Sequence, residues 1–523
     1  MLKNWIKVFI LLQALHSCAV AQDPVQRKYA DLLTEESAKQ HLTLLTSPAF
    51  EGRGTGQKGG EKAAQYLAEQ FKSFGLKAPV NGSYFQPLKL VRSSYLVKTF
   101  TLDGKSYQNG KDFYVQGDNP LTDFSASEVV CVAFGIQDAK HDDLKGIDVR
   151  DKVVLVINED EPTDANGNSV LTGTTKKSEW STSRLKRLQE LAKHNPKMIL
   201  AYSSAVPQMI ERFGNRITAG RFALDSNKDA VPEKNAAQMA PVVNISPEIA
   251  NSILAKKQTN VEALKKKPSS FRVPTKLLAN MGVSKQNFSD PNVLGLLEGT
   301  DLKNEIVVIS GHYDHDGILP DGTIYPGADD NGSGTVGVLE LAKVFSQAKK
   351  DGKGPRRSIL FIGFAAEEKG LLGSQFYSEN PIFPLSNTVT CLNMDMIGRI
   401  DDKHLNGDHN YIHVIGSDKL SSELYQINKK SNDLYTKMEI DYMYDDPKDP
   451  MRIYYRSDQY NFAKHGIPVT FYFSGLHPHY HTPDDTVDKI DFPMMVKREK
   501  LVFHTAWEVA NREDRLAVDS NKE

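Results

Sequence analysis

The chain has 523 residues, of which 40% are hydrophobic and 25% charged, so disordered, collagen-like and low-complexity classes are excluded and two or three folded domains are expected. Lys and Arg number 64 against 66 Asp and Glu, a net charge of −2 that argues against nucleic acid as a partner. Three cysteines are too few for a disulfide scaffold or a cysteine-based zinc site.

The N-terminus has the order typical of an export signal. Two lysines precede an apolar run at residues 8–12, and a small-residue site, Ala-Val-Ala, follows at residues 19–21. We therefore expect residues 1–21 to be a signal peptide and the mature protein to be periplasmic or extracellular. Lipid anchoring at Cys18 is the alternative. No later run reaches the ~20 apolar residues of a membrane-spanning helix, so no membrane span is expected.

The next part of the chain, residues 22–90, contains a predicted amphipathic helix. Between Gly60 and Gly75 apolar residues recur at helical spacing, and Gly75 is a stop signal. From about residue 91 to 272 the pattern changes to short β-type runs divided by polar loops, such as residues 129–132 and 153–157. This stretch is predicted to be a β-rich domain inserted into another one.

From residue 273 to 523 strands and helices alternate. Apolar strand candidates occur at residues 305–309, 359–362, 389–394 and 467–473, and a helix with one apolar face lies between the first two. Continuous apolar strands separated by helices predict an α/β fold with a mixed, mostly parallel sheet covered by helices on both faces. Functional groups are then expected in the loops at the strand ends.

Histidines and carboxylates gather in these loops. They stand in five segments, namely residues 311–316, 327–334, 364–368, 393–396 and 479–483. Each segment alone is typical of an ordinary loop, but the five together indicate a site. Imidazole and carboxylate are the ligands expected for zinc or a similar divalent ion. Because a single three-ligand zinc site would not use so many carboxylates, the pattern favours two ions that share a bridging carboxylate.

With these motifs the chain resembles the M28 family of co-catalytic zinc exopeptidases, over about residues 33–90 and from residue 274 to the C-terminal region. Residues 91–272 resemble the protease-associated (PA) domain that some members carry as an insertion, most clearly at residues 145–156. The resemblance implies the zinc exopeptidase fold and two Zn²⁺ ions, although another divalent metal is an alternative. It implies five metal ligands: His312, Asp330 and Asp395 for one ion, and Asp330, Glu368 and His481 for the other.

The resemblance also implies roles around the ligands. Glu367 would be the general base, Tyr480 would stabilise the oxyanion, and Asp314 would orient His312. The Asp330–Asn331 peptide bond would be cis. Ordinary core packing of Tyr480 and a loop hydrogen bond of Asp314 are the alternatives. Two further residues stand in family-like contexts beside the substrate, although structural hydrogen bonding explains them equally well: Asp458 and Arg399.

The sequence thus predicts a secreted metallopeptidase that hydrolyses peptide substrates with a metal-activated water. We expect an aminopeptidase, because the loops around the ligands carry more spare acids than cations and so suit an ammonium group. The alternatives are a carboxypeptidase or dipeptidase of glutamate carboxypeptidase type, a glutaminyl cyclase, and an inactive binding protein on this scaffold. Side-chain preference and oligomeric state do not follow from the sequence.

Overall fold

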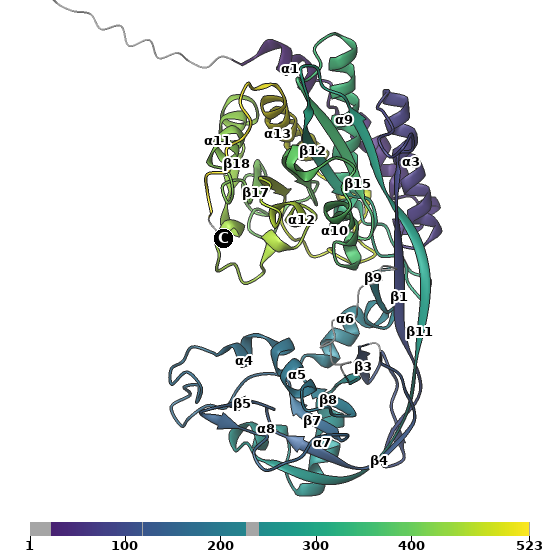
Figure 1. Cartoon of the computed structure of the whole chain (residues 1–523), viewed down its shortest axis with the longest axis vertical. Coiled ribbons are helices and arrows are strands. Elements are labelled where there is room, and N and C mark those ends of the chain that lie inside the picture. The colour runs from purple at the N-terminus through teal and green to yellow at the C-terminus, as the bar shows by residue number, and fades with distance from the viewer. Residues whose placement is uncertain (1–21, 118, 226–239, 522–523) are drawn as a thin grey trace, which may run out of the picture.

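The computed structural model describes residues 22–117, 119–225 and 240–521. Two lobes are joined by a long antiparallel ribbon of strands β1 (Phe85–Leu102) and β11 (Ser270–Leu297), as Figure 1 shows. The N-terminal half of β11 pairs with a strand of one lobe and its C-terminal end with a strand of the other. One continuous strand therefore belongs to both lobes. The predicted export signal at residues 1–21, with Cys18, lies outside the described residues.

The first lobe contains the N-terminal and C-terminal parts of the chain. Its strands are β12 (Leu302–His312), β13 (Gly317–Ile318), β14 (Ile324–Tyr325), β15 (Arg357–Phe364), β16 (Thr388–Met394), β17 (Tyr411–Ile415), β18 (Glu439–Asp441) and β19 (Val469–Phe473). Its α-helices are α1 (Pro24–Ala30), α2 (Glu35–Leu45), α3 (Lys58–Phe74), α9 (Gly334–Lys350), α10 (Leu372–Glu379), α11 (Ser422–Ser431), α12 (Tyr460–Ala463) and α13 (Phe492–Asn511).

The sheet of this lobe is mixed and mostly parallel, which confirms the predicted fold class. Its order is β18-β17-β19-β16-β12-β15-β11, with parallel pairing from β19 to β15. Alternate residues of β12 enter two cores. Val307 and Ile309 pack with the helices α1, α2, α3, α9, α11 and α13, whereas Val308 packs with α10 and α12. Strands buried on both faces explain why the sequence shows continuous apolar runs.

The second lobe lies between the two ribbon strands in sequence. Its strands are β2 (Lys105–Ser106), β3 (Phe113–Gln116), β4 (Leu121–Val132), β5 (Gln137–Asp138), β6 (His141–Asp142), β7 (Val153–Ile157), β8 (Met198–Tyr202), β9 (Arg221–Leu224) and β10 (Val242–Ile245). Its helices are α4 (Glu179–Thr182), α5 (Arg184–Ala192), α6 (Val206–Thr218), α7 (Pro247–Leu254) and α8 (Val261–Lys266).

This lobe has a core of its own, built on the order β4-β7-β8-β10-β3. The strands predicted at residues 129–132 and 153–157 are confirmed as parts of β4 and β7. Among the described residues of this lobe five α-helices accompany the strands, so the lobe is α/β rather than simply β-rich. The expected domain limits at residues 90 and 272 fall inside β1 and β11. Extended strands that run from one lobe to the other leave no linker for composition to reveal.

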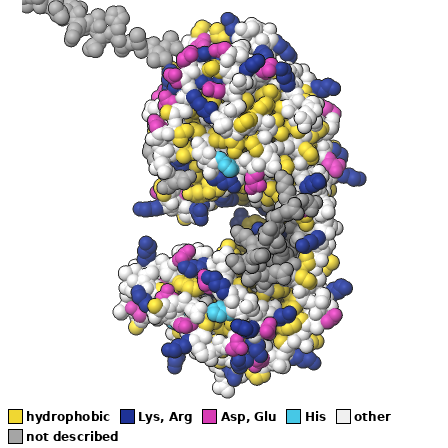
Figure 2. Space-filling model, viewed as in Figure 1, with side chains coloured by type: hydrophobic (Ala, Val, Ile, Leu, Met, Phe, Trp, Pro, Cys, Tyr) yellow, Lys and Arg dark blue, Asp and Glu magenta, His cyan; other side chains and the backbone are white. Residues whose placement is uncertain are grey.

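The predicted helix between Gly60 and Gly75 is confirmed as α3. Its apolar face, including Leu67 and Phe71, is buried in the core of the first lobe. Gly75 ends the helix with a φ of 87°, a left-handed conformation that glycine adopts at little cost. None of the helices in the described ranges has the length and hydropathy needed to cross a bilayer. Figure 2 shows a notch between the two lobes on the face opposite the ribbon.

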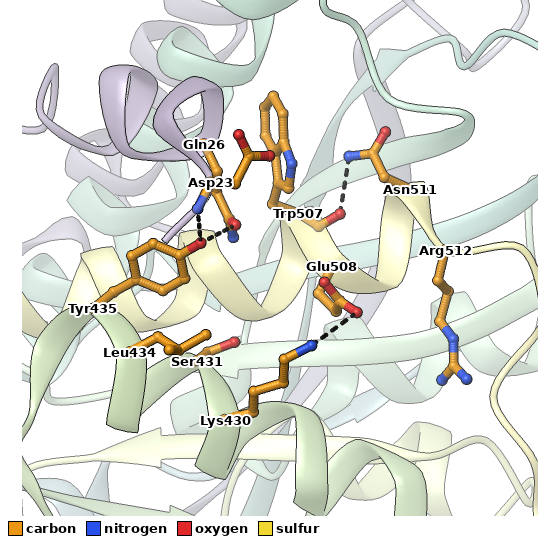
Figure 3. A pocket seen from close by; sticks show the side chains of 10 residues that line it. All are labelled: Asp23, Gln26, Lys430, Ser431, Leu434, Tyr435, Trp507, Glu508, Asn511 and Arg512. Atoms are coloured by element: carbon orange, nitrogen blue, oxygen red, sulfur yellow. Dashed lines mark hydrogen bonds and ion pairs between the residues drawn. The ribbon is translucent and has the colours of Figure 1, made fainter. Parts of the chain in front are cut away.

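A shallow pocket marks the place where α1 is attached to the C-terminal helix (Figure 3). The Tyr435 hydroxyl accepts a hydrogen bond from the backbone N–H of Asp23 at 2.9 Å and donates one to Gln26 at 2.8 Å. Lys430 lies 4.0 Å from Glu508 on α13. These polar contacts join α1 to the residues after α11, and α11 to α13.

The buried side chain of Arg53 ties together several loops beneath the strand ends. Its guanidinium group donates hydrogen bonds to the carbonyl oxygens of Tyr313 at 2.8 Å, Leu45 at 3.2 Å, Pro326 at 2.6 Å and Gly327 at 2.8 Å. Burial lowers the pKa of Arg53 to about 10, so the group stays charged at neutral pH. One side chain thus holds the loops after β12 and before the segment of Asp330.

We expect Arg53→Met to lower the free energy of unfolding by about 3 kcal/mol or more. The substitution keeps apolar volume but leaves several buried carbonyl groups without a donor, each at a cost of about 1–3 kcal/mol. Chemical denaturation measures the change. The control is Arg27→Met on α1, where the side chain is exposed and the expected change is below about 0.5 kcal/mol. Similar losses for both variants would contradict the role given to Arg53.

Candidate metal centre

The carboxyl ends of four strands meet at one edge of the first lobe's sheet. Because β12, β15, β16 and β19 run parallel in neighbouring pairs, the residues after them converge. His312 ends β12, Glu367 and Glu368 follow β15, and Asp395 and His481 follow β16 and β19. The remaining predicted ligand, Asp330, lies in η3 (Ala328–Ser333), which leads into α9. The structure therefore brings all five predicted ligands and Glu367 together.

A first group surrounds the Nε2 atom of His312. This atom lies 3.4 Å from Oδ1 of Asp395, 3.6 Å from Oδ1 of Asp330 and 3.7 Å from Oε2 of Glu367. The imidazole is almost completely buried, and its Nδ1 is 3.1 Å from the backbone oxygen of Asp314. Nε2 is thus the nitrogen that faces the carboxylates.

A second group surrounds the Nε2 atom of His481. It lies 2.7 Å from Oδ2 of Asp330 and 3.4 Å from Oε1 of Glu368. Asp330 therefore presents one carboxylate oxygen to each group. This is the arrangement of a carboxylate shared by two cation positions.

The donor set fits divalent cations. His312 Nε2 and Asp330 Oδ2 are buried and form no hydrogen bond of good geometry with the described residues. Four carboxylates, those of Asp330, Glu367, Glu368 and Asp395, share the same small volume. Burying several acids together costs free energy unless cations compensate them. Imidazole and carboxylate are suitable ligands for zinc and related ions.

The acids differ in their electrostatic surroundings. Burial raises the pKa of Asp330 and of Glu367 well above the usual carboxyl range. Burial opposes ionisation of Glu368 too, but His481, His315 and Arg216 together hold its pKa well below that range. The pKa is therefore raised for Glu367 and lowered for its neighbour Glu368.

The loop that carries Asp330 is held from both sides. Asp485 accepts hydrogen bonds from the backbone N–H groups of Asp329 at 3.0 Å and Asp330 at 3.1 Å. The Asn331 amide donates to the carbonyl oxygen of Met394 at 2.9 Å. The Asp330–Asn331 peptide bond is cis, which confirms the prediction.

Asp314 lies beneath His312 and Glu367. One of its carboxylate oxygens accepts the backbone N–H of Glu367 at 3.0 Å, and the other accepts the Thr55 hydroxyl at 2.8 Å. The carboxylate is 3.8 Å from Nδ1 of His312, and it is the backbone oxygen of Asp314 that lies within hydrogen-bond distance. The side chain therefore positions the segment of Glu367 directly.

Two of the remaining predicted residues lie beside the group. The Tyr480 hydroxyl accepts a hydrogen bond from Arg456 at 3.2 Å and lines a pocket together with Asp330 and Glu367. Asp458 is fully buried, and burial raises its pKa to about 7. Its neighbour Ser457 donates a 2.6 Å hydrogen bond to Asp395.

Arg399 points elsewhere. Its guanidinium lies 3.1 Å from Nδ1 of His479 and 4.0 Å from Asp485, behind the loop that carries Asp330. Among the described residues that line the pocket, Arg399 is not included. These contacts match the structural alternative that the sequence left open for this residue.

Two further residues contact the candidate metal centre, and neither was predicted from the sequence. His315 is completely buried and its Nδ1 lies 2.8 Å from Oε1 of Glu368. Its place in the motif at residues 311–316 was the one available signal. Arg216 comes from the second lobe and lies 3.2 Å from Oε2 of Glu368. Nothing in the sequence near Arg216 indicates this contact, because it depends on how the lobes pack.

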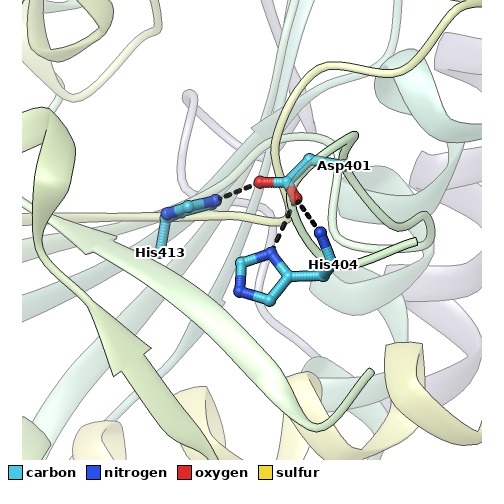
Figure 4. A group of neighbouring side chains, drawn as sticks. All are labelled: Asp401, His404 and His413. Carbon is cyan, nitrogen blue, oxygen red and sulfur yellow. Dashed lines mark hydrogen bonds and ion pairs between the residues drawn. The ribbon is translucent and has the colours of Figure 1, made fainter. Parts of the chain in front are cut away.

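A separate histidine–carboxylate group joins the loop after β16 to strand β17 (Figure 4). Asp401 accepts hydrogen bonds from Nδ1 of His404 at 2.6 Å and from Nε2 of His413 at 2.8 Å. Despite burial, these two partners bring the pKa of Asp401 to about 2. The His404 ring stacks on Tyr411 with centroids 3.4 Å apart. Since the facing atoms are already hydrogen-bonded to one another, the group acts as a structural brace.

Comparison with known proteins agrees with this geometry. The sequence profile of Peptidase family M28 matches residues 292–506, which contain all five predicted ligands. This segment is therefore similar to peptidase family M28. A probable leucine aminopeptidase of Arthroderma benhamiae is 31% identical over 240 residues, covering 44% of this chain and 61% of that protein. Aminopeptidase YwaD of Bacillus subtilis is 28% identical over 245 residues, covering 43% of this chain and 46% of that protein.

Solved structures show that the similarity in fold extends beyond residues 292–506. An aminopeptidase from Aneurinibacillus sp. strain AM-1 has a TM-score of 0.61 at 18% identity, covering 94% of this chain and 98% of its own. A zinc aminopeptidase from Bacillus subtilis has a TM-score of 0.56 at 19% identity with the same coverage. At these identities the likeness concerns the fold alone.

We expect Zn²⁺ to raise the melting temperature of the metal-stripped protein. A saturating ligand that binds only the folded state, at 100 times its Kd, stabilises by about 2.7 kcal/mol, which corresponds to several degrees. Thermal unfolding with and without added Zn²⁺ measures the shift. Asp330→Asn should lose most of it, whereas the exposed substitution Asp433→Asn should keep it. An equal shift in Asp330→Asn would contradict the shared-carboxylate arrangement.

Proposed function

We propose that this protein is a di-zinc aminopeptidase that removes residues from the N-termini of peptides. The observation that carries the proposal is the position of Asp330, whose two carboxylate oxygens face separate histidine–carboxylate groups at 3.6 Å and 2.7 Å. The aminopeptidase names of the relatives and the zinc named for the Bacillus subtilis structure support it.

The ligand assignment follows from the two groups. His312, Asp330 and Asp395 would hold one ion, and Asp330, Glu368 and His481 the other. When bound, the ions would polarise the scissile carbonyl and acidify a water molecule. The protein's own part is to position the peptide, accept and return a proton, and stabilise the developing charge.

Glu367 is proposed as the general base. It borders the pocket, and Asp314 fixes its backbone. Burial raises its pKa, so its carboxylate has a high affinity for the proton of the attacking water. The carboxyl group would then donate that proton to the leaving amine. Glu368 lies beside His481, His315 and Arg216, which hold its pKa below the usual range, so it suits the role of a ligand.

Tyr480 is proposed to donate a hydrogen bond to the oxyanion. Burial, with the acids Asp330 and Glu368 nearby, raises the pKa of its phenol, so the hydroxyl keeps its proton at neutral pH. Arg456 holds the hydroxyl oxygen from the other side. A positioned donor of this kind stabilises charge that develops in the transition state.

Part of the pocket lining is apolar. It includes Met396, Ile453, Phe471, Phe473 and Leu476. An apolar side chain would gain free energy by entering this surface. The lining holds Asp330, Glu367 and Asp395 against the cation Arg456, so its charge would favour a protonated amine over a substrate carboxylate. The pocket therefore favours an apolar N-terminal residue over the C-terminal residue required by the carboxypeptidase alternative.

Two organisational proposals rest on the sequence. Residues 1–21 would direct export, with lipid anchoring at Cys18 as the alternative, so the enzyme would act outside the cytoplasm. Residues 91–272 would be a PA-like insertion between two peptidase segments, residues 22–90 and 273–523. A separate core in the second lobe supports the insertion.

The aminopeptidase proposal is tested with a matched pair of leucine-initiated tripeptides, one with a free N-terminus and one acetylated. We expect release of leucine from the free peptide and loss of cleavage on acetylation, because acetylation removes the ammonium group that the acids would bind. Mass spectrometry of the products distinguishes N-terminal from C-terminal release. Equal cleavage of both peptides, or release of the C-terminal residue, would favour the carboxypeptidase alternative.

Glu367→Gln tests the catalytic role of the base. The amide keeps the shape of the side chain but cannot accept the proton, so kcat should fall by roughly 10²–10⁴-fold. Metal analysis should give two ions per chain in both the wild type and the variant. Glu379→Gln, at an exposed position on α10, should match the wild type in both measurements. Near-normal turnover in Glu367→Gln would refute the proposed mechanism.

A further inference from the structure

Arg216 extends from the second lobe into the candidate metal centre. It lies on α6, whose C-terminal end leads into β9. Strand β9 pairs antiparallel with β1, and Phe222 of β9 packs against Ala366 and Leu372 of the first lobe. The second lobe is therefore attached to the first beside Glu367 and Glu368. This attachment holds Arg216 at the outer side of the metal group.

The contacts of Arg216 are with acids and a histidine. Its Nη2 atom lies 2.9 Å from Oδ1 of Asp316 and 3.2 Å from Oε2 of Glu368, and its Nη1 contacts Nδ1 of His481. Its side chain is 22% exposed, whereas that of Asp316 is 1% exposed. Two acids outweigh the effect of burial and raise the pKa of Arg216. The guanidinium is a permanent positive charge at this edge of the site.

Asp316 lies behind His481. Its carboxylate is 3.7 Å from Nδ1 of His481, while Nε2 of the same ring faces Asp330 and Glu368. The only cations near this carboxylate in the described structure are Arg216 and Lys369, the latter at 3.6 Å. A buried carboxylate with so few partners is costly unless it serves a charged or polar neighbour. His481 is the neighbour of Asp316 that also faces Asp330 and Glu368.

The position of the proton on His481 determines whether Asp316 or Arg216 can be the hydrogen-bond partner of Nδ1. An imidazole that binds a cation through Nε2 carries its proton on Nδ1. A guanidinium has only donors, so the contact between Nη1 of Arg216 and Nδ1 would have to open once Nδ1 carries a proton, and Asp316, which lies 3.7 Å away, would then accept that proton. Metal-binding histidines commonly donate their second nitrogen to a carboxylate, which orients the ring.

We propose that Asp316 and Arg216 form an outer pair that positions His481, so that the second lobe controls how tightly one of the two ions is held. Asp316 accepts the Nδ1 proton of His481. Arg216 holds Asp316 and the outer oxygen of Glu368. The inference builds on the metal centre of the proposed function but concerns residues outside the ligand set. Both are positioning residues, and neither contacts the reacting atoms.

The test measures Zn²⁺ affinity by competition with a chromophoric chelator. Arg216→Ala and Asp316→Asn should weaken one of the two ions by about 10–100-fold and leave the other unchanged. Arg216→Lys keeps the charge but not the forked geometry, so its affinity should lie between wild type and Arg216→Ala. Arg212→Ala, at an exposed position on the same helix, is the matched control and should bind both ions as the wild type does.

Several outcomes would overturn the inference. One is unchanged affinity for both ions in Arg216→Ala and Asp316→Asn. Another is an equal loss of both ions, which would indicate general damage; circular dichroism and melting of the metal-free variants identify that case. A raised KM with normal ion affinity would make Arg216 a substrate contact instead. A single ion in the wild type would refute the proposed di-zinc function, whereas weaker binding of that ion in Arg216→Ala would still support the outer pair.

Discussion

Concentrated negative charge is the constraint on which the rest of this structure depends. Asp330, Glu367, Glu368 and Asp395 lie together at the end of a buried sheet, where water screens them less than at the surface. The surrounding structure supplies positive charge and N–H groups in an ordered way. Arg216, His315 and His481 lie beside Glu368, and a further acid, Asp485, accepts the backbone N–H groups of the loop that carries Asp330. Divalent ions would complete the compensation that protein groups provide only in part.

The ribbon of β1 and β11 connects this local concentration of charge with the arrangement of the two lobes. One strand of 28 residues contributes to the sheets of both lobes, so each lobe's position is set by the same hydrogen-bond ladder. Strand β9 pairs with β1 of the ribbon, and this pairing places the preceding helix α6 beside the candidate metal centre. A side chain of the second lobe, Arg216, thus contributes to the charge balance of the first. Under the proposed function, the inserted lobe therefore contributes a side chain to the surroundings of the active centre.

Much of the site was predictable because its residues follow strands that the sequence marks clearly. Runs such as residues 306–309 and 359–362 are continuously apolar since both faces of the sheet are buried, and predicted site residues follow soon after such runs. The ribbon was not predicted as a connection, because its central residues alternate between polar and apolar and resemble ordinary loop-bounded strands. The contact of Arg216 with His481 joins residues 265 positions apart. No local pattern encodes such a contact, and it follows only from the packing of the lobes.

The adjacent residues Glu367 and Glu368 illustrate how surroundings rather than residue type set chemical roles. Ala366, with a φ of 54°, turns the backbone into a short helical segment in which the two carboxylates diverge. Glu367 enters the acid-lined pocket beside His312, where burial and neighbouring acids favour its protonated form. Glu368 turns to His315, His481 and Arg216, which favour its ionised form. Pairs of acids whose environments separate their proton affinities are suited to divide the work of proton transfer and charge binding. The turn at Ala366 therefore produces, from two identical side chains, one group suited to move a proton and one suited to hold a cation.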